Sequence, residues 1–420
     1  MTKWIMQDVL GNPSILVGIF ALIGLALQKK GFVQIMTGTL KTIMGFVILG
    51  AGAQVIIGTL DVFGNMFQAA FQLKGVVPNN EAIVAVAQKM FGKETAWIMV
   101  FGMLVNLLVA RITPFKYVFL TGHHTFYMAA MLSAILSAAN VTGAPMVVIG
   151  SLLLGLAMVL FPALLQPYVR KITGSDDFAV GHFGSLGYFT AGTIGKWFGD
   201  RKVSTEDLKV PKSLGFLRDS SVAVSLTMTV LFLLVAIVAG PSYVERSLSG
   251  GTNFVVYAII QGITFAAGVY IILAGVRMLI SEIVPAFKGI ADKVIPEAKP
   301  ALDCPTVFPY APNAVIIGFL SSFGTGLALM FVMPWLGLAV IIPGLVPHFF
   351  TGATAGVFGN ATGGLRGALL GGMANGLLIS FLPALLLPVL GSLGFEATTF
   401  GDSDFAFVGI ILGNILQLFK

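Results

Sequence analysis

The sequence has few charged side chains and only one cysteine. Asp, Glu, Lys and Arg make up 10% of its 420 residues, whereas 57% are hydrophobic. A soluble protein carries about 25% charged residues and needs polar groups to cover its surface. These proportions exclude a soluble enzyme and a disordered regulator. The single cysteine, Cys304, excludes an internal disulfide and a multi-cysteine metal or iron–sulfur site.

Motifs for ATP-driven transport and for common hydrolases are also absent. The glycine-rich run GNATGGLRG at 359–367 lacks the Lys-Ser or Lys-Thr ending of a P-loop, so its glycines are expected to form a tight turn near Arg366. No HExxH or GxSxG sequence and no readable catalytic set of Ser, His and Asp occurs. We therefore expect no catalytic residue, no metal site and no cofactor in this chain.

Long apolar runs are what the sequence contains instead. Uncharged runs of about 20 residues recur along the chain, and its mean hydropathy is +0.95. The sequence therefore predicts an all-α polytopic membrane protein with about eleven transmembrane helices, some of them broken or re-entrant. The expected spans lie near 13–29, 33–58, 95–111, 118–139, 144–167, 220–240, 253–281, 310–333, 335–350, 366–393 and 404–419.

The distribution of charge predicts how these spans are oriented. With the N-terminus outside and the C-terminus cytoplasmic, most Lys and Arg side chains fall on the cytoplasmic side, as the positive-inside rule requires. The net charge of +6 therefore reflects sidedness, and no nucleic-acid partner is expected. Residues 168–219 are predicted to be a cytoplasmic segment, with a helix at Thr205–Lys209 that Ser204 caps.

A faint internal repeat divides the chain. The segment that begins at Gly45 aligns with the one that begins at Gly268, an offset of 223 residues that matches Gly52 with Gly275. Inverted five-span repeats of this kind are typical of alternating-access transporters. Alternatively, glycine-rich apolar helices simply look alike. The predicted division of the single membrane domain over 1–420 is a first repeat near 13–167, the cytoplasmic segment at 168–219, a second repeat near 220–393 and a final span at 404–419.

Three ionisable residues stand in apolar surroundings that are rich in glycine or proline. They are His123 in LTGHHTF, His182 in VGHFGSLGYF and Asp303 in LDCPTVFPY. Such groups are costly at membrane depth unless they are paired or hydrated. Prolines after Asp303 prevent a regular helix there, and an irregular segment, RITPFKYVF, also precedes His123. Each half thus supplies a broken segment, which predicts a binding site. Alternatively, His123 packs, His182 lies in a loop and Asp303 caps a helix.

Other polar residues are weaker candidates. His124 faces away from His123 on a helix, and it and His348 can both be explained as packing residues. Asn313 lies where a continuous helix resumes after the prolines. Cys304 has no histidine near it in the sequence and is expected to be inert. Neutral polar groups with a single Asp suit a polyhydroxylated small molecule better than a bare ion.

Several segments resemble, in order from about residue 15 to 375, the ascorbate-type IIC membrane components of the phosphoenolpyruvate-dependent sugar phosphotransferase system. They are KTIMGFVILGAGAQVI, FLTGHHTF, the VGH of the long loop, LDCPTVFPYAPNAVIIGF and IIPGLVPHFFTGATAGVFGNATGGLRGA. The resemblance implies a homodimeric transporter in a bacterial inner membrane, with a substrate-binding core that moves like an elevator against a scaffold. It also implies that a separate IIB protein, fed by IIA, docks at the cytoplasmic face and phosphorylates the sugar acid as it emerges.

The resemblance and the polar pattern together give a set of predicted substrate-binding residues: His123, His182, Asp303, Gly52, Phe349, Tyr127, Gln54 and Asn313. Two positions depart from the ascorbate pattern, because Tyr127 and Phe183 stand where glutamines are expected. A related sugar is therefore an alternative to ascorbate.

Two other functions stay open. A secondary transporter of a small polyhydroxylated solute, coupled to protons or sodium, would use His182 and Asp303 as its relay. A membrane-embedded enzyme would bind a metal through its histidines, and the absence of carboxylates near the histidines in the sequence argues against it.

Overall fold

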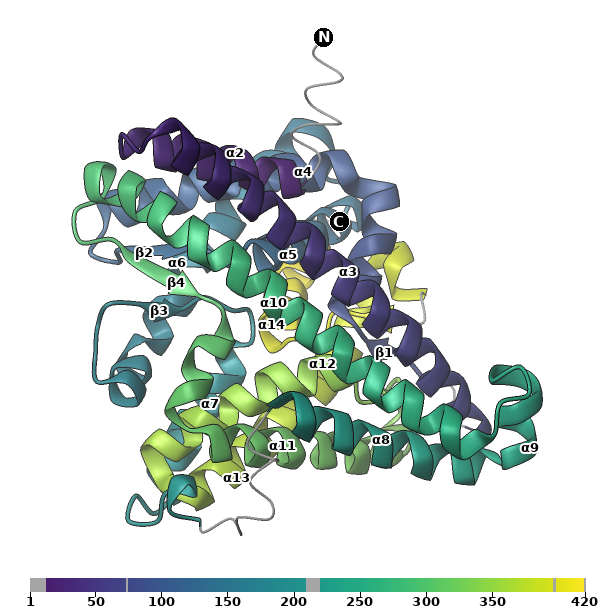
Figure 1. The fold of residues 1–420 in the computed structure, drawn as a ribbon. Helices are drawn as coiled ribbons and strands as arrows, with labels where there is room; N and C mark the ends of the chain where they lie inside the picture. Colours follow the sequence, from purple (N-terminus) through teal and green to yellow (C-terminus); the bar gives the residue numbers. More distant parts are fainter. Residues whose placement is uncertain (1–12, 73–74, 209–219, 396–397, 419–420) are drawn as a thin grey trace. The chain divides into compact units, whose positions relative to one another are not determined.

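The computed structural model describes residues 13–72, 75–208, 220–395 and 398–418, and most of them are helical (Figure 1). The longer helices are α2 (Pro13–Leu27), α3 (Phe32–Phe71), α4 (Asn80–Ile112), α5 (Gly122–Ala138), α6 (Gly143–Thr173), α7 (Ser185–Phe198), α8 (Ser220–Ala239), α10 (Phe254–Val294), α11 (Pro312–Val332), α13 (Ala353–Leu386) and α14 (Ser403–Gln417). Single turns are η2 (Thr205–Asp207), α9 (Pro241–Tyr243), η4 (Val244–Leu248), η5 (Cys304–Tyr310), η6 (Met333–Leu336), α12 (Leu345–Pro347), η7 (His348–Gly352), η8 (Leu387–Val389) and η9 (Gly391–Phe395).

Within the described residues, five helical segments are long and apolar enough to cross a bilayer. They are Phe32–Gly52, Met90–Ile112, Gly143–Thr173, Pro312–Leu336 and Leu345–Val389. A bent pair, Met228–Ala239 with Pro241–Leu248, would make a sixth. The prediction of a mostly helical, polytopic membrane protein is thus supported, and the number eleven stays a prediction.

Between the helices of the described residues lie five short strands, which the sequence did not predict. β2 (Tyr117–Phe119), β4 (Lys299–Leu302) and β3 (Ala179–Val180) form one parallel sheet in that order (Figure 1). β1 (Val77–Pro78) pairs with β5 (Thr398–Thr399), and Val76 bridges Ile341. Each strand lies where a helix is broken, so its backbone groups need partners from elsewhere in the chain.

The contacts divide the chain into two compact units. The first comprises 1–40, 76–208 and 280–420, and the second comprises 41–75 and 209–279. Within the second unit, the ring of Phe63 meets that of Phe232 edge to face at 5.2 Å. Both sheets belong to the first unit, and so do His123, His182 and Asp303, which follow strands of the larger sheet.

Both broken segments predicted from the sequence are confirmed. The chain leaves α4, passes through β2 and starts α5 at Gly122. The proline-rich segment leaves β4, makes the 3-10 turn η5 and resumes as α11 at Pro312. The φ angle that proline fixes, together with its missing N–H, accounts for the interruption before α11.

The predicted span at 335–350 is wrong as a continuous helix. After η6 the chain is extended, because the Val76 carbonyl accepts a hydrogen bond from the N–H of Ile342 at 3.0 Å. Helix resumes at Leu345 and continues to Leu386, with a break at Gly363 and Gly364 where a tight turn was expected. Gly364 has φ 60° and ψ −151°, a conformation that side-chain-bearing residues avoid.

The described part of the predicted cytoplasmic segment is largely ordered structure. Helix α6 continues to Thr173, β3 follows, and α7 packs against α13. Ser204 caps its turn as predicted, since its hydroxyl accepts a hydrogen bond from the Glu206 N–H at 3.2 Å, although the turn η2 is a 3-10 helix. Residues 209–219 lie outside the described part of the chain.

Candidate functional site

The parallel sheet gathers the predicted site residues. Because β2, β4 and β3 run in the same direction, the chain leaves all three strands at one edge. His123 follows β2 across a short turn, His182 follows β3, and Asp303 directly follows β4. The Thr121 hydroxyl donates a hydrogen bond to the Gly181 carbonyl and so joins two of these turns. Three residues from distant parts of the sequence therefore meet at one place.

Asp303 lies between two histidines. Its carboxylate is 3.6 Å from His123 Nε2 and 3.9 Å from His182 Nε2. The same carboxylate accepts the Cys304 N–H at 2.7 Å, as the cap of η5. The His123 side chain is 16% exposed, whereas Asp303 and His182 are buried. The structure therefore brings together the trio that the sequence predicted.

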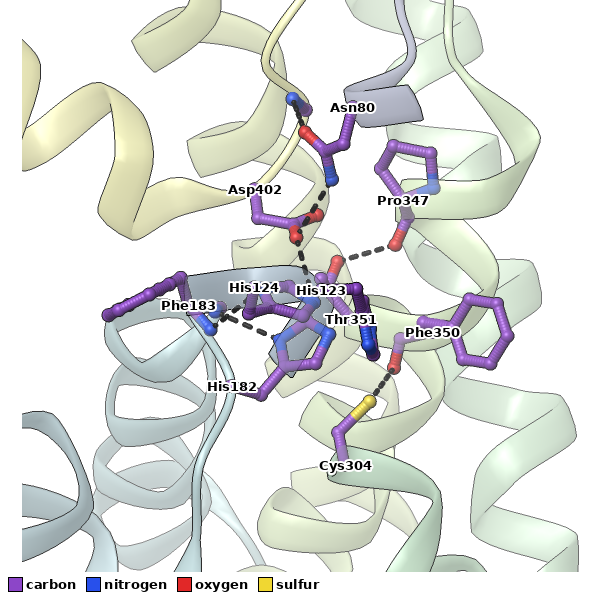
Figure 2. Close-up of polar contacts among 12 residues, drawn as sticks. Asn80, His123, His124, His182, Phe183, Cys304, Pro347, Phe350, Thr351 and Asp402 are labelled. Atoms are coloured by element: carbon purple, nitrogen blue, oxygen red, sulfur yellow. Dashed lines mark hydrogen bonds and ion pairs between the residues drawn. The ribbon is translucent and has the colours of Figure 1, made fainter. Parts of the chain in front are cut away.

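His124 belongs to the same cluster, against the expectation that it could be a packing residue alone. Its Nε2 lies 3.9 Å from Asp402, and its ring centre is 3.8 Å from that of His182 (Figure 2). The ring of Phe405 stacks on it, with centres 5.6 Å apart. Polar and aromatic groups thus surround a row of three histidines.

Sequence reasoning missed two buried acids and was wrong to expect a single Asp. Asp402 is 2% exposed and accepts a hydrogen bond from the Asn80 amide at 3.0 Å. Asp404 is fully buried and accepts the N–H groups of Ser185 and Leu186, each at 2.8 Å. The only signal was the pair of acids in FGDSDF at the start of an apolar run, which resembles an ordinary helix cap.

Backbone contacts indicate which nitrogen of His124 and of His182 carries the proton. The Phe183 N–H donates to His124 Nδ1 at 3.3 Å (Figure 2), and the Gly184 N–H donates to His182 Nδ1 at 3.1 Å. A nitrogen that accepts a hydrogen bond has its lone pair free of a proton, so in the neutral ring the proton sits on Nε2. Both histidines therefore present an N–H donor toward a carboxylate.

The cluster also has the composition of a metal site. Three groups bring their ligand atoms within 4.8 Å of one another: His123, His124 and Asp303; His124, His182 and Asp402; and His182, Asp303 and Cys304. The expectation that the histidines lack carboxylate neighbours is therefore wrong. A metal-bound histidine normally donates its other ring N–H to an acceptor. In His124 the other nitrogen accepts the Phe183 N–H instead, so the geometry there favours hydrogen bonding to a ligand over binding a metal.

Cys304 lies in the cluster although no histidine is near it in the sequence. It is buried, and its sulfur is 3.9 Å from the Phe350 carbonyl (Figure 2). Its predicted inertness stays a prediction, and its position beside His182 makes it part of the wall of the site.

The aromatic candidates are buried. Tyr127 meets the His123 ring edge to face at 5.7 Å. Phe183 stacks on Phe119 with centres 5.0 Å apart. Phe349 packs edge to face against Phe319 at 5.4 Å, within an aromatic group that also contains Phe308 and Phe350.

Asn313 makes the hydrogen bonds described for it outside the histidine cluster. The Asn313 amide donates to the Thr205 carbonyl at 3.0 Å, and its backbone N–H donates to Glu206 at 2.9 Å, so it fixes the start of α11 to η2. Gly52 and Gln54 belong to the part of α3 in the second unit, where Gly52 is buried and Gln54 is exposed. Their role in substrate binding stays a prediction.

Comparison with known proteins agrees with this chemistry. A family model described as the sugar-specific permease component of the PTS system matches residues 8–404. A curated protein of Mycoplasma pneumoniae, named as an ascorbate-specific PTS system EIIC component, is 26% identical over a 419-residue alignment. The alignment covers 85% of this chain and 62% of that protein, so the chain spans less than two thirds of the relative's length.

Proposed function

Since the chain belongs to the sugar-specific permease family of the phosphotransferase system, we propose that it carries L-ascorbate or a related sugar across a bacterial inner membrane. A separate IIB protein, fed by IIA, phosphorylates the sugar at the cytoplasmic face. The residues of this chain bind and release the sugar, and the phosphoryl-transfer residues belong to the partners. The proposed binding and release of the sugar by this chain require no cofactor.

The observation that carries the proposal is the alternation of donors and acceptors in the histidine cluster. His182 and His124 present Nε2–H donors, and Asp303 and Asp402 present carboxylate oxygens within 4 Å of them. Each hydroxyl of a sugar both donates and accepts a hydrogen bond, so neighbouring hydroxyls match neighbouring donor and acceptor groups. Buried aromatic rings next to the cluster suit the apolar faces of a sugar ring.

The identity of the sugar depends on two positions near His123 and His124. Tyr127 keeps one hydroxyl where the ascorbate pattern has glutamine, whereas Phe183 has no polar atom in its side chain. An unpaired buried hydroxyl costs about 1–3 kcal/mol. A substrate with fewer polar groups than ascorbate on that side would fit this pocket better, which is why a related sugar belongs to the proposal.

The proposed architecture has two inverted repeats. A shift of 223 residues moves α3 (Phe32–Phe71) onto α10 (Phe254–Val294). After β1 the chain forms a long helix, an extended segment, two helices, a strand and a last helix. The same kinds of element follow β4 in the same order. This correspondence supports extending both repeats past the ends near 167 and 393 that the sequence predicts. The first repeat would then include α7, and the second would include α14.

The proposed transport cycle is an elevator-like movement in a homodimer, with the N-terminus outside and the C-terminus cytoplasmic. In support, the histidine cluster lies wholly within one of the two compact units. A binding site contained in one unit can move with that unit without being taken apart, which an elevator mechanism needs.

Uptake into membrane vesicles tests the proposal. Vesicles that contain this chain, supplied with IIA, IIB and phosphoenolpyruvate, are expected to accumulate labelled ascorbate or a related sugar in phosphorylated form. Vesicles without IIB are the control. If no sugar acid or pentitol enters in a phosphate-dependent manner, the proposal is wrong.

A proton- or sodium-coupled transporter is the second candidate, because Asp303 lies between His123 and His182 like a proton relay. A pH or sodium gradient that drives uptake without IIB would favour it.

A further inference from the structure

Helix α7 begins without a capping side chain of its own. Its cap position is Gly184, and a Cβ atom there would lie 2.7 Å from the Tyr188 hydroxyl and 3.0 Å from a methyl group of Thr351. A Ser, Thr, Asp or Asn at this position would therefore have to displace the neighbouring side chains. The first N–H groups of a helix have no partner within the helix and need one from elsewhere.

The start of α14 supplies those partners. The carboxylate of Asp404 accepts the N–H groups of Ser185 and Leu186 with one oxygen each, at 2.8 Å. The Ser403 hydroxyl accepts the next N–H, that of Gly187, at 3.3 Å. A fully buried acid from the other end of the chain thus caps α7, and its negative charge suits the positive end of the helix.

The turn that Asp404 caps is the one that orients His182. The Asp404 N–H donates to the Phe183 carbonyl at 2.9 Å, and the Ser185 hydroxyl donates to the His182 carbonyl at 2.6 Å. Within the turn, the Gly184 N–H donates to His182 Nδ1 at 3.1 Å. The Tyr188 hydroxyl of α7 lies 2.8 Å from the same nitrogen. The positions of these two groups, and with them the donor at His182 Nε2, depend on how the turn and the start of α7 are held.

We propose that Asp404 is a positioning residue for substrate binding: by capping α7 it fixes the turn at 182–185 and keeps the His182 Nε2–H directed into the site. The inference rests on the proposed function, because it takes His182 to be a substrate contact. Asp404 itself touches no substrate and acts through His182.

Asp404→Asn is the variant that tests this role most directly. An amide keeps the size of the carboxylate but has one acceptor oxygen, so its NH₂ group would face a helix N–H. Ascorbate binding to the purified full chain is expected to weaken about tenfold or more, since a buried N–H is left without a partner. Asp207→Asn is the matched control, because Asp207 caps the exposed turn η2 through the Ser204 N–H at 2.9 Å, and binding is expected to be unchanged.

A double-variant cycle separates positioning from general damage. In the His182→Gln background, Asp404→Asn is expected to weaken binding less than about twofold, because the residue it acts through is already replaced. Ser403→Ala removes the Gly187 contact and the hydrogen bond that the Ser403 hydroxyl donates to Asp404 at 3.0 Å, but it leaves the carboxylate of Asp404 in place. It is expected to have a smaller effect in the same direction and serves if Asp404→Asn does not fold. Unchanged affinity of folded Asp404→Asn, or equal losses in both backgrounds, would overturn the inference.

A readout without substrate keeps this test independent of the proposed function. In the ¹⁵N spectrum of histidine-labelled protein, His182 is expected to show a single Nε2–H form that becomes a mixture in Asp404→Asn. If the wild-type protein binds no ascorbate, the proposed substrate is wrong, while the spectrum still decides the role of Asp404. An identical His182 signal in the two proteins would contradict that role.

Discussion

His182 Nε2 lies 3.9 Å from Asp303 Oδ1, although the two residues follow different strands that meet only in the folded chain. The distance is longer than a hydrogen bond. Donor and acceptor therefore retain hydrogen-bonding capacity that a sugar hydroxyl can use. The shared edge of the parallel sheet determines this spacing, because β3 and β4 are paired at Val180 and Leu302, which stand two residues before His182 and one residue before Asp303.

His182→Ala should abolish measurable ascorbate binding while expression stays normal. The variant removes the Nε2–H donor and leaves the sugar hydroxyl that it would bind without that partner, a loss of about 1–3 kcal/mol for each buried group left unpaired. Titration calorimetry on purified protein measures the effect. His182→Gln, which can place an amide N–H near the Nε2 position, should retain part of the affinity. Unchanged affinity of the alanine variant would mean that His182 is only a loop residue.

Asp402→Asn should weaken substrate binding about tenfold. The substitution removes the negative charge that faces His124 Nε2 and turns one acceptor oxygen into a donor beside the Asn80 amide. Calorimetry with ascorbate is again the measurement. Asp177→Asn, at an exposed acid that bonds Ser175, is the control and should bind normally. Equal affinities of the two variants would remove Asp402 from the binding site.

Tyr127→Gln should raise the preference for ascorbate over a competing pentitol, by about tenfold, because it restores an amide next to His123. Competition against labelled ascorbate measures the preference. Tyr127→Phe removes the hydroxyl without adding an amide and should shift the preference the other way. If both variants behave like the wild-type protein, position 127 does not contact the substrate.

The Asp176 carboxylate should stabilise the folded protein at neutral pH and stabilise it less at strongly acidic pH. The Arg170 guanidinium, which bonds it at 2.7 Å, and then Lys299 hold the pKa of its carboxyl well below its usual range. Because the folded pKa is lowered, the stabilising effect is complete above the ordinary pKa of 3.8 and is lost progressively as the pH falls from there through the lower pKa of the folded protein.

Asp176→Asn should therefore lower the melting temperature at pH 7 and lower it by a smaller amount near pH 3. The carboxylate is 41% exposed, so solvent screening limits its effect to about 1 kcal/mol or less. Thermal unfolding in detergent at both pH values is the measurement. A difference between wild type and variant that is the same at both pH values would contradict the assignment.

Composition was enough to predict the helical membrane fold and the two broken segments, because apolar length and proline act locally. The strands could not be predicted in the same way. Residues 338–342 form an apolar run that can be either helix or strand, and their extended form depends on pairing with Val76, which is distant in the sequence. Local propensity carries no information about such a partner.

The same limit applies to the site. His123, His182 and Asp303 were recognisable because each combines an ionisable group with a broken apolar segment. Asp402 and Asp404 stand where a helix starts, and acids are common there. Only the folded chain shows that their partners are Asn80 and the first N–H groups of α7.

The order of the strands has a consequence for how the protein is made. β4 lies between β2 and β3, so the two earlier strands cannot be joined until residue 302 has been synthesised. β1, which comes first, waits for β5 near the end of the chain. The first half of the nascent chain therefore enters the membrane while β1, β2 and β3 still lack their strand partners. The binding site is completed last. Substitutions in β4 or at the start of α14 should accordingly reduce the yield of inserted protein before they reduce transport by the molecules that do fold.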